Sequence, residues 1–590
     1  MKAFLAPWRL LAMRPMAFSP APHAHDASSV GDASSLGAPA TAERTLTRDT
    51  TTPAAFVASA RRALATVEGQ RRLAWALVIA CVTIDVLVVG QHVLLRHVNY
   101  HSDAFDLGNM DQAVWNTLHG HFFRFTNRGT DWFGPPTRLA IHVEPILLII
   151  APFYLIHPGA TTLLAIQTVA LAAGAIPVLM LALRRLPSLP LVGVAFVVAY
   201  LCTPELLGEA LWDFHPVTLA TPLLLAAFYF FDARRYGWMI LMGMLAAACK
   251  EDVALALIPL GVLVALVRGR PRLGIGLVAG AITWTALCFF VIMPHFNAGA
   301  SVGGNAYWYR YSQLGSSPAS ALRHVLTNPL LLVSIIFSGN KLGYLALLLR
   351  TAGGMGIFAP VWWIAGLPEL AINLLSTQSP QYSGFYHYNA IVLAVATVAS
   401  IYGADGLYRA RVHVQLGKPL PEVPMGVGRL GRAREAAARV ARWWERQLRR
   451  VPISPRWFGV IVATWLLLAT GWNLWATAYK IGGFWSAGST LDPQAPRIAA
   501  LLDRIPSTAI VAATDTLNPH LSDRDTIYLL PDPLAYQAQY VAVDLVDIPP
   551  AMRAEDTQMF EAMLASGRYH VVGIAGRVTV LRRVGPPLSG

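Results

Sequence analysis

Long apolar segments, separated by short polar stretches, recur along most of this chain and constrain its fold more than any other feature. Residues 73–95, 273–293 and 458–478 are each long enough to cross the hydrocarbon core of a bilayer as a helix. Hydrophobic residues make up 55% of the sequence and charged residues only 13%. The sequence therefore predicts a mainly α-helical, polytopic membrane protein with a bundle of about 11–13 helices.

The positive charge of the chain follows the membrane topology. A net charge of +13 could indicate nucleic-acid binding, but Lys and Arg lie in short loops beside the apolar segments, as the positive-inside rule requires. We therefore predict no nucleic-acid partner and a cytoplasmic N-terminus. The four cysteines lie inside apolar segments and form no recognisable disulfide or metal motif.

Composition divides the chain into parts that lie in different environments. The tail is rich in Ala, Pro, Ser, Thr and Arg, and we expect it to be disordered and cytoplasmic. The basic loop is expected to be cytoplasmic and to end in an amphipathic helix over 429–450. The predicted parts are the tail 1–72, the transmembrane core 73–404 with its first external loop 96–140, the basic loop 405–456, the last transmembrane helix 457–479, and the external region 480–590.

Within the core, residues 146–156 form an apolar run that is too short to span a bilayer comfortably. Residues 238–248 and 253–267 flank the charged triplet Lys250-Glu251-Asp252, which we place at the external tip of a helical hairpin. Because both halves are short, the alternative is one long helix with a buried polar centre. The remaining crossings are predicted at 160–183, 189–207, 217–231, 273–293, 325–350, 355–372 and 388–404.

The C-terminal region is predicted to be a soluble domain outside the cytoplasm, because acidic residues reappear and the apolar runs shorten. Its alternating strands and helices predict a small α/β domain. It contains neither a Gly-rich phosphate loop nor a nucleophile elbow. Strands are predicted at 509–513, 526–530, 540–545 and 577–583, and helices at 495–504 and 555–566.

A polar stretch in the first external loop concentrates the chemistry of the chain. Asp103 and Asp106 are three residues apart, so a helix would place both on one face, and Asp111 and Gln112 follow closely. Carboxylates gathered at a membrane surface suit metal binding, sugar binding or general-base catalysis. The alternative is a solvated loop that caps a helix.

Later segments bring further ionisable residues to the same side of the membrane. Ionisable groups are costly in a membrane, so such a cluster usually lines a cavity. There Arg310 could bind phosphate, and a histidine with a carboxylate could bind a divalent metal. The alternative is that each residue ends a turn or anchors an interface. The candidates are His142, Glu144, Asp213, His215, Glu251, Arg310, Glu369 and His387.

Several short motifs together resemble an uncharacterised bacterial family of predicted membrane proteins, over a range from about residue 75 to the C-terminal domain. The resemblance implies a multi-pass protein of the bacterial inner membrane. The motifs are Asp106-Leu-Gly-Asn-Met-Asp-Gln-Ala-Val-Trp115, His142-x-x-Pro145, Trp212-Asp-Phe-His-Pro216, Lys250-Glu-Asp252, Tyr386-His-Tyr388 and Thr514-Asp-x-Leu-x-Pro-His520.

More distantly, the layout is similar to the GT-C glycosyltransferases, such as protein mannosyltransferases, arabinosyltransferases and the aminoarabinose transferase. These carry a catalytic Asp in the first external loop and often end in an external soluble domain. By position, Asp106 or Asp103 matches that catalytic residue. The chain has Asp103-x-x-Asp106 but no Asp-Glu or Asp-x-Asp pair, which leaves the need for Mg²⁺ or Mn²⁺ open.

The resemblance implies transfer of a sugar from a polyprenyl-phosphate donor to an envelope glycan, lipid or protein. In this hypothesis Asp106 is the base, membrane lipids surround the site, and His142 and Glu144 are the candidate metal ligands. A transporter or lipid flippase and a non-catalytic envelope assembly protein remain as alternatives. The expected substrate-binding residues are Arg310, Asp111, Gln112, Asp213, His215, Glu251 and His387.

Overall fold

A computed structural model describes residues 65–127, 136–297, 307–415, 453–546 and 550–588. Five helices in these ranges are long and apolar enough to cross a membrane, and the number rises to seven if two bent pairs each form one span. This confirms a mainly helical membrane protein. The five are Val67–Val98, Ala160–Arg185, Pro271–Phe296, His387–Val412 and Pro455–Ala487.

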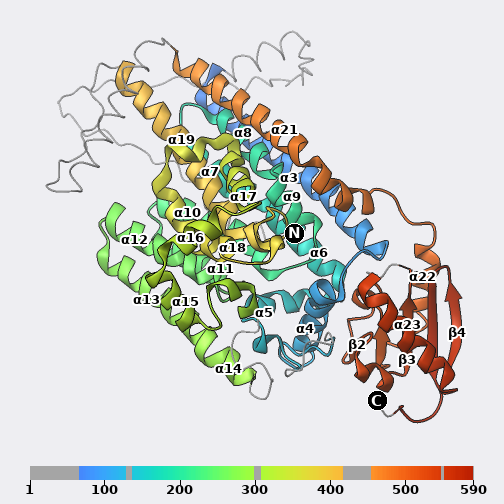
Figure 1. The fold of residues 1–590 in the computed structure, drawn as a ribbon. Coiled ribbons are helices and arrows are strands. Elements are labelled where there is room, and N and C mark those ends of the chain that lie inside the picture. The colour runs from blue at the N-terminus through green and yellow to red at the C-terminus, as the bar shows by residue number, and fades with distance from the viewer. Residues whose placement is uncertain (1–64, 128–135, 298–306, 416–452, 547–549, 589–590) are drawn as a thin grey trace, which may run out of the picture. The chain divides into compact units, whose positions relative to one another are not determined.

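The helices form one bundle, and a small sheet domain follows at its C-terminal end (Figure 1). The first helices are α3 (Val67–Val98), α4 (Asn109–Leu118), α5 (Ile146–Ile150), α6 (Ala160–Ala173), α7 (Ala175–Arg185), α8 (Pro190–Leu201), α9 (Pro204–Leu211), α10 (Ala220–Asp232), α11 (Tyr236–Ala247) and α12 (Leu257–Val267). Then follow α13 (Pro271–Leu287), α14 (Met293–Phe296), α15 (Pro318–Thr327), α16 (Pro329–Ile336), α17 (Lys341–Arg350), α18 (Leu367–Leu374), α19 (Ala390–Gln415) and α21 (Pro455–Ala487).

Short 3₁₀ and π segments connect these helices. They are η1 (Ala104–Gly108), η2 (Arg138–Ala140), η3 (Ala151–Leu155), η4 (Pro216–Leu219), η5 (Val253–Ala256), η6 (Cys288–Ile292), η7 (Trp308–Leu314), η8 (Thr351–Phe358), η9 (Pro360–Gly366), η10 (Ser379–Tyr382) and η11 (His387–Asn389).

The first transmembrane helix begins earlier than the sequence predicts. The Thr66 side chain caps α3 by accepting a hydrogen bond from the Gly69 N–H at 3.0 Å. Glu68 and Arg72 then pair one turn apart at 3.2 Å. Residues 67–72 were expected to belong to the tail, but this cap and ion pair place them in the helix. Residues 1–64 and the expected amphipathic helix at 429–450 lie outside the described residues.

Two predicted crossings are wrong as continuous helices. Residues 325–350 are divided among α15, α16 and α17, because Pro329 begins a new helix and Gly339 adopts a φ of +50°. Residues 355–372 are divided among η8, η9 and α18, because the helix breaks at Ala359 and Pro360 begins a new segment. The pair α8 and α9 corresponds to the predicted crossing 189–207 and bends by 48°.

The C-terminal domain is a five-stranded sheet with a helix on each face, which confirms the predicted α/β class. Its strand order is β2-β1-β3-β5-β4, with β1 parallel to both neighbours and β5 antiparallel to both of its own. Alternate strand residues face the two cores, one beneath α22 and the other beneath α23. The elements are α22 (Ala495–Leu502), β1 (Val511–Ala513), η12 (Asn518–His520), β2 (Ile527–Leu529), η13 (Pro533–Gln537), β3 (Tyr540–Asp544), α23 (Pro550–Ala565), β4 (Tyr569–Ala575) and β5 (Val578–Arg583).

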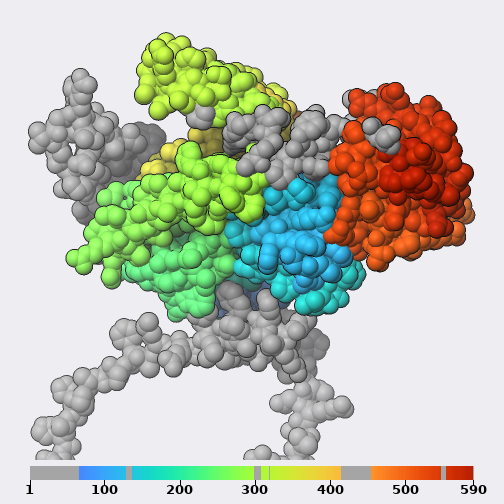
Figure 2. All heavy atoms as spheres, turned by 90° about the horizontal axis from the view of Figure 1, so that it is seen from below, coloured from blue at the N-terminus to red at the C-terminus, as the bar shows by residue number. Residues whose placement is uncertain are grey.

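The end of α3 brings the polar stretch beside the C-terminal domain. Asn99 is the C-cap residue of α3, and its side chain donates hydrogen bonds to the carbonyls of Ala487 and Thr490, at 2.9 and 2.7 Å. These carbonyls lie where α21 ends and the C-terminal domain begins. As a result the first-loop residues, in blue, abut the C-terminal residues, in orange to red (Figure 2).

Candidate functional site

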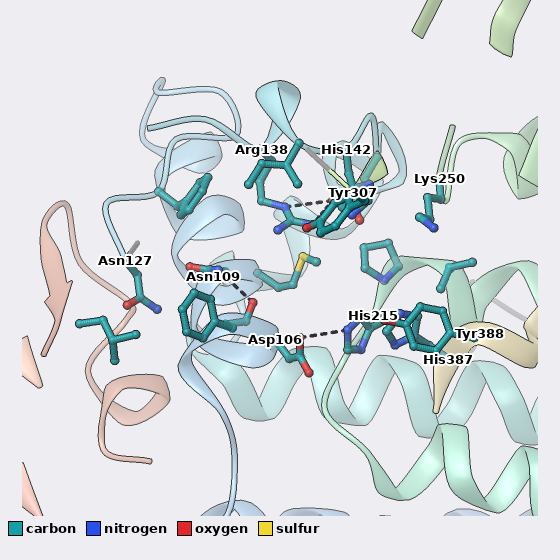
Figure 3. Close-up of a pocket in the computed structure, with 18 of the residues that line it drawn as sticks. Asp106, Asn109, Asn127, Arg138, His142, His215, Lys250, Tyr307, His387 and Tyr388 are labelled. Carbon is teal, nitrogen blue, oxygen red and sulfur yellow. Dashed lines mark hydrogen bonds and ion pairs between the residues drawn. The ribbon is translucent and has the colours of Figure 1, made fainter. Parts of the chain in front are cut away.

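A cavity of about 640 Å³ lies where the polar stretch meets the later loops and the C-terminal domain (Figure 3). Four of the predicted site residues that line it are Asp106, His142, His215 and Arg310. Glu144 and His387 line it as well. The structure therefore brings together six candidates from five separate segments of the chain. Leu529, the last residue of strand β2, and Leu530 and Pro531, which follow it, supply part of the wall.

Asp106 lies in the π segment η1, and both of its carboxylate oxygens have a polar partner. The Trp212 indole N–H donates a hydrogen bond to Oδ2 at 2.8 Å, and His215 Nε2 lies 3.3 Å from Oδ1. The side chain remains 29% exposed, toward the cavity. Burial opposes ionisation of this carboxyl, but His215 and Trp212 outweigh it and hold the pKa of Asp106 below its usual value.

His215 connects Asp106 to a second histidine. Its Nδ1 contacts the backbone carbonyl of Asp213 at 3.0 Å, which leaves Nε2 facing Asp106. Burial lowers the pKa of His215, but the Asp106 charge and its hydrogen bond outweigh this and raise the pKa overall. The His387 ring stacks on His215 at 3.6 Å, and its buried Nδ1 has no hydrogen-bond partner within the described ranges.

Basic side chains dominate the opposite side of the cavity. Lys250 donates to Asp252 at 2.7 Å, Arg138 to Glu144 at 2.8 Å, and His142 Nδ1 contacts Glu251 at 2.9 Å. Arg310 has no carboxylate partner in the described part of the chain. Its guanidinium lies over the Tyr307 ring at 4.2 Å. A cavity of this kind favours an anionic ligand opposite Asp106.

Four predicted substrate-binding residues lie outside the cavity lining, and two of them are Asp213 and Asp111. Asp213 is fully buried, pairs with Arg96 at 2.5 Å and accepts the Asp103 backbone N–H at 2.6 Å. Asp111 accepts hydrogen bonds from the hydroxyls of Tyr154 and Ser522, both at 2.6 Å. These side chains hold the loop in place and have no open face toward the cavity.

Gln112 and Glu251 also orient neighbouring groups and do not line the cavity. The Gln112 carbonyl accepts the backbone N–H groups of Thr126 and Asn127, at 2.8 and 3.2 Å. One Glu251 oxygen contacts His142, and the other accepts the Val143 N–H at 3.0 Å. Glu251 therefore fixes the orientation of the His142 ring at the cavity wall.

Asp103 and Asp106 have opposite electrostatic environments. Burial, together with the nearby carboxyls of Asp213 and Asp515, raises the pKa of Asp103 to about 8. Asp103 is therefore largely protonated at neutral pH, whereas Asp106 is ionised. Asp103 is also absent from the cavity lining. Of the two candidate catalytic acids, only Asp106 has the charge and the position of a base.

The predicted metal ligands fit a divalent ion poorly. His142 Nδ1 is engaged by Glu251, and Glu144 is engaged by Arg138 through two nitrogens, at 3.1 and 2.8 Å. Within the described ranges no three His, Cys, Asp or Glu side chains gather closely enough to hold a metal ion.

Several cavity residues were not among the predicted site residues. Lys250 lines the cavity, whereas Trp212 does not line it but donates a hydrogen bond to Asp106; the two residues stand inside motifs noted in the sequence, next to Glu251 and Asp213. In each motif the neighbour of the predicted acid reaches the site. Tyr307 and Arg138 carry no distinctive signal in the sequence, because their positions depend on loop geometry.

Comparisons with known proteins give a family match and likenesses to solved structures. The family model described as "Predicted membrane protein (DUF2079)" matches residues 96–575. Among solved structures, the chain is similar to ArnT from Cupriavidus metallidurans bound to undecaprenyl phosphate, with 12% sequence identity, a TM-score of 0.44, and coverage of 86% of this chain and 98% of that chain.

The same ArnT in the apo state gives 13% identity, a TM-score of 0.42 and the same coverage of both chains, 86% and 98%. No curated protein matches the sequence.

Proposed function

The chain belongs to the DUF2079 family of predicted membrane proteins, and from the Asp106 cavity we propose that it transfers a sugar from a polyprenyl-phosphate donor to an acceptor hydroxyl. The proposal rests on two charged groups that line the same cavity of about 640 Å³. One is an ionised carboxylate, Asp106, with an open face. The other is a guanidinium, Arg310, without a carboxylate partner among the described residues.

The chemistry is a single displacement at the anomeric carbon of the donor sugar. Asp106 accepts the proton of the acceptor hydroxyl while that oxygen forms a bond to the anomeric carbon. The bond between this carbon and the phosphate oxygen breaks, and its electron pair leaves with the polyprenyl phosphate. The configuration at the carbon inverts, and the proton on Asp106 is afterwards released to water.

Trp212 and His215 prepare the carboxylate for this step. The indole N–H and the imidazole bond one oxygen each, which fixes the orientation of the carboxylate and keeps it ionised. The Asp106 side chain is 29% exposed and lines the cavity, where its carboxylate can meet the acceptor hydroxyl.

The basic residues of the opposite wall stabilise the leaving group. Arg310 and Lys250 both line the cavity, and a phosphate that gains negative charge in the transition state is stabilised by fixed cations. Lys250 keeps its proton. Burial alone would lower its pKa, but the charges of Asp252 and Glu251 outweigh that effect and raise it.

We place the cavity on the external face of the inner membrane. The segment from Pro216 to Asp232 begins at the cavity and ends in a cluster where Asp232 binds Arg184, Arg185 and Arg268. Because arginines concentrate on the cytoplasmic side, the opposite end of this segment faces away from the cytoplasm. The acceptor would then be a glycan, lipid or protein of the cell envelope.

A complementation experiment in the bacterium that carries this chain tests the proposal. A strain that lacks the gene is complemented with the wild type, Asp106→Asn or the exposed-site control Glu561→Gln, and its polyprenyl-phosphate sugars are measured by mass spectrometry. We expect one such lipid to accumulate without the gene and with Asp106→Asn, and to return to its normal level with the other two. Equal lipid profiles in all strains would contradict a transferase.

A further inference from the structure

The motif Thr514-Asp-x-Leu-x-Pro-His520 has no part in the chemistry above, although it directly follows strand β1 of the C-terminal domain. Its last residues form η12. The motif does not face solvent, because Thr514, Asn518 and Pro519 are all buried. It lies against the first loop, and the His520 ring stacks on His97 at 4.0 Å, at the end of α3.

The motif binds the backbone of the π segment that carries Asp106. Asp515 Oδ1 accepts the Ala104 N–H at 2.9 Å. The Ala104 carbonyl accepts a hydrogen bond from Asn127 Nδ2 at 2.9 Å, and Asn518 Nδ2 in turn donates to Asn127 Oδ1 at 2.8 Å. Ala104 is the first residue of η1, two positions before Asp106. Both backbone polar groups of Ala104 are therefore held by the C-terminal domain, directly or through Asn127.

The other end of η1 is packed just as closely against the same motif. A Cβ atom added to Gly108 would lie 2.6 Å from Asn518 Oδ1, which leaves no space for a side chain. On the bundle side, Asp213 accepts the backbone N–H of Asp103 at 2.6 Å. The segment is thus held between the bundle and the C-terminal domain on either side of Asp106.

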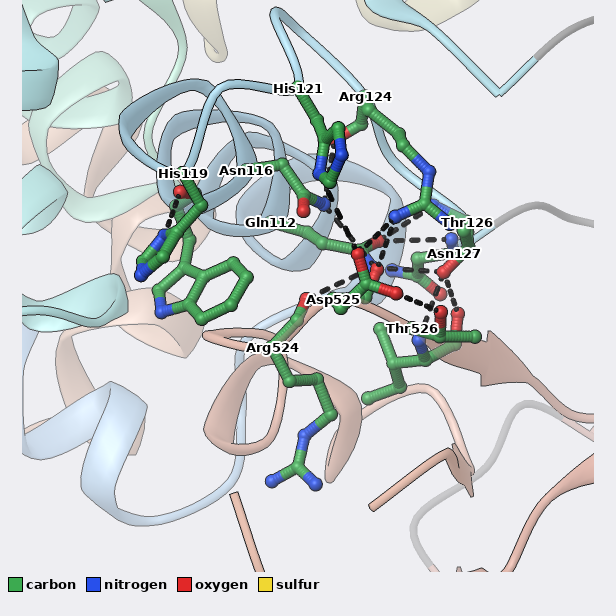
Figure 4. A network of polar contacts seen from close by, with 12 residues as sticks. Gln112, Asn116, His119, His121, Arg124, Thr126, Asn127, Arg524, Asp525 and Thr526 are labelled. Atoms are coloured by element: carbon green, nitrogen blue, oxygen red, sulfur yellow. Dashed lines mark hydrogen bonds and ion pairs between the residues drawn. The ribbon is translucent and has the colours of Figure 1, made fainter. Parts of the chain in front are cut away.

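A wider network fixes the domain in this position (Figure 4). Thr126 Oγ1 donates to the Ile527 carbonyl at 2.7 Å and accepts the Ile527 N–H at 2.9 Å. Gln112 Nε2 donates to the Asp525 carbonyl at 3.1 Å, and Arg124 pairs with the Asp525 side chain. These contacts align β2 with the loop, and the residues after β2 consequently enter the cavity wall.

We propose that Asp515 is a positioning residue for Asp106, and that the C-terminal domain is a structural part of the active site. This inference rests on the proposed transferase function only for its catalytic consequence. Asp515 does not line the cavity. It acts through the Ala104 N–H, which sets where η1 begins and therefore where the Asp106 carboxylate meets Trp212 and His215.

The test compares two replacements that differ in a single property. Asp515→Asn keeps an oxygen that can accept the Ala104 N–H, whereas Asp515→Ala removes it. Hydrogen–deuterium exchange of the peptide that spans residues 101–110 is measured by mass spectrometry on the full chain in nanodiscs, with Glu561→Ala as the exposed-site control.

We expect the Ala104 amide to exchange at least tenfold faster in Asp515→Ala and at a rate close to wild type in Asp515→Asn and Glu561→Ala. Equal exchange in the wild type and the three variants would contradict the claim that the Asp515 side chain holds the Ala104 N–H. If Asp515→Ala does not fold, Asn518→Ala provides a second test. It removes the hydrogen bond from Asn518 to Asn127, which holds the Ala104 carbonyl, and is expected to accelerate exchange in the same peptide.

A second readout separates positioning from general stability. With the lipid-linked sugar identified by complementation as donor, Asp515→Ala is expected to lower kcat at least tenfold with little change in the donor KM, and Asp515→Asn to restore it. Faster exchange with unchanged kcat would refute the catalytic role of the anchor. If Asp515→Ala accelerates exchange but the wild-type protein transfers no sugar, the proposed function is refuted. The positioning of η1 by Asp515 is supported all the same.

Discussion

Replacing Trp212 by Phe tests whether the ionised state of Asp106 depends on the indole hydrogen bond. The substitution keeps an aromatic ring beside Tyr386 and Phe484 but removes the N–H that donates to Asp106 Oδ2 at 2.8 Å. A hydrogen bond to a charged group contributes about 1.5–3 kcal/mol. One pKa unit corresponds to about 1.36 kcal/mol, so the pKa of Asp106 should rise by roughly one to two units.

The direction of the pH effect follows from the role of Asp106 as a base. Asp106 acts only when ionised, so a higher pKa moves the acid limb of the pH–rate profile to higher pH by the same one to two units. Above that limb the carboxylate is ionised in both proteins, and the rates should converge. The assay is the rate of sugar transfer from the lipid-linked donor between pH 4 and 9.

A matched control removes an indole hydrogen bond of the same length elsewhere. Trp465 donates to the Gly353 carbonyl at 2.8 Å, far along the chain from the cavity residues, and Trp465→Phe should leave the profile unchanged. An acid limb that stays in place in Trp212→Phe would show that Asp106 is not the titrating base. A loss of rate that is equal at every pH would indicate a structural effect.

Three further predictions concern the cavity and the junction with the C-terminal domain. Replacing Arg310 or Lys250 by Ala should weaken the binding of undecaprenyl phosphate to the purified protein at least tenfold, measured by native mass spectrometry, because each removes a cation from the cavity wall. Gly108→Ala should lower the unfolding free energy by about 1–3 kcal/mol, measured by denaturation, because its Cβ would lie 2.6 Å from Asn518 Oδ1. Burial and the Asp523 charge raise the pKa of Asp111 to about 7, so the folded chain keeps a proton that the unfolded chain releases near pH 4. Stability should therefore fall as the pH rises from about 4 to about 7, and Asp111→Asn should remove that slope from the pH dependence of the thermal midpoint.

Uninterrupted apolar segments made much of the bundle predictable from the sequence. The predicted crossings 73–95, 273–293 and 458–478 all lie within observed helices. The prediction failed where Pro329 and Pro360 interrupt an apolar run and begin new helical segments. A hydropathy average over a window hides a single helix-breaking residue, whereas the backbone changes direction at that residue. Strand β4 was missed because it is an edge strand with largely exposed residues, so it lacks a buried alternating pattern.

The sequence could identify the acidic and basic residues of the site but not their partners. Asp106, His215 and Arg310 were predicted, and all three line one cavity. Asp213 looked equally suitable, yet Arg96, 117 positions earlier in the sequence, neutralises it. Asp111 is bonded by Ser522, 411 positions later. Whether a carboxylate faces a cavity or a partner is decided by such distant contacts, which no local pattern contains.

The most direct test of the central claim is a measurement of product release by the purified protein. Wild-type protein in nanodiscs is incubated with the polyprenyl-phosphate sugars of its own bacterium and an envelope extract, and free polyprenyl phosphate is quantified by mass spectrometry. The account predicts time-dependent release by the wild type and by Asp103→Asn, because Asp103 is already largely protonated at neutral pH. It predicts at least a hundredfold slower release by Asp106→Asn. Equal release by wild type and Asp106→Asn would contradict the assignment of Asp106 as the catalytic base.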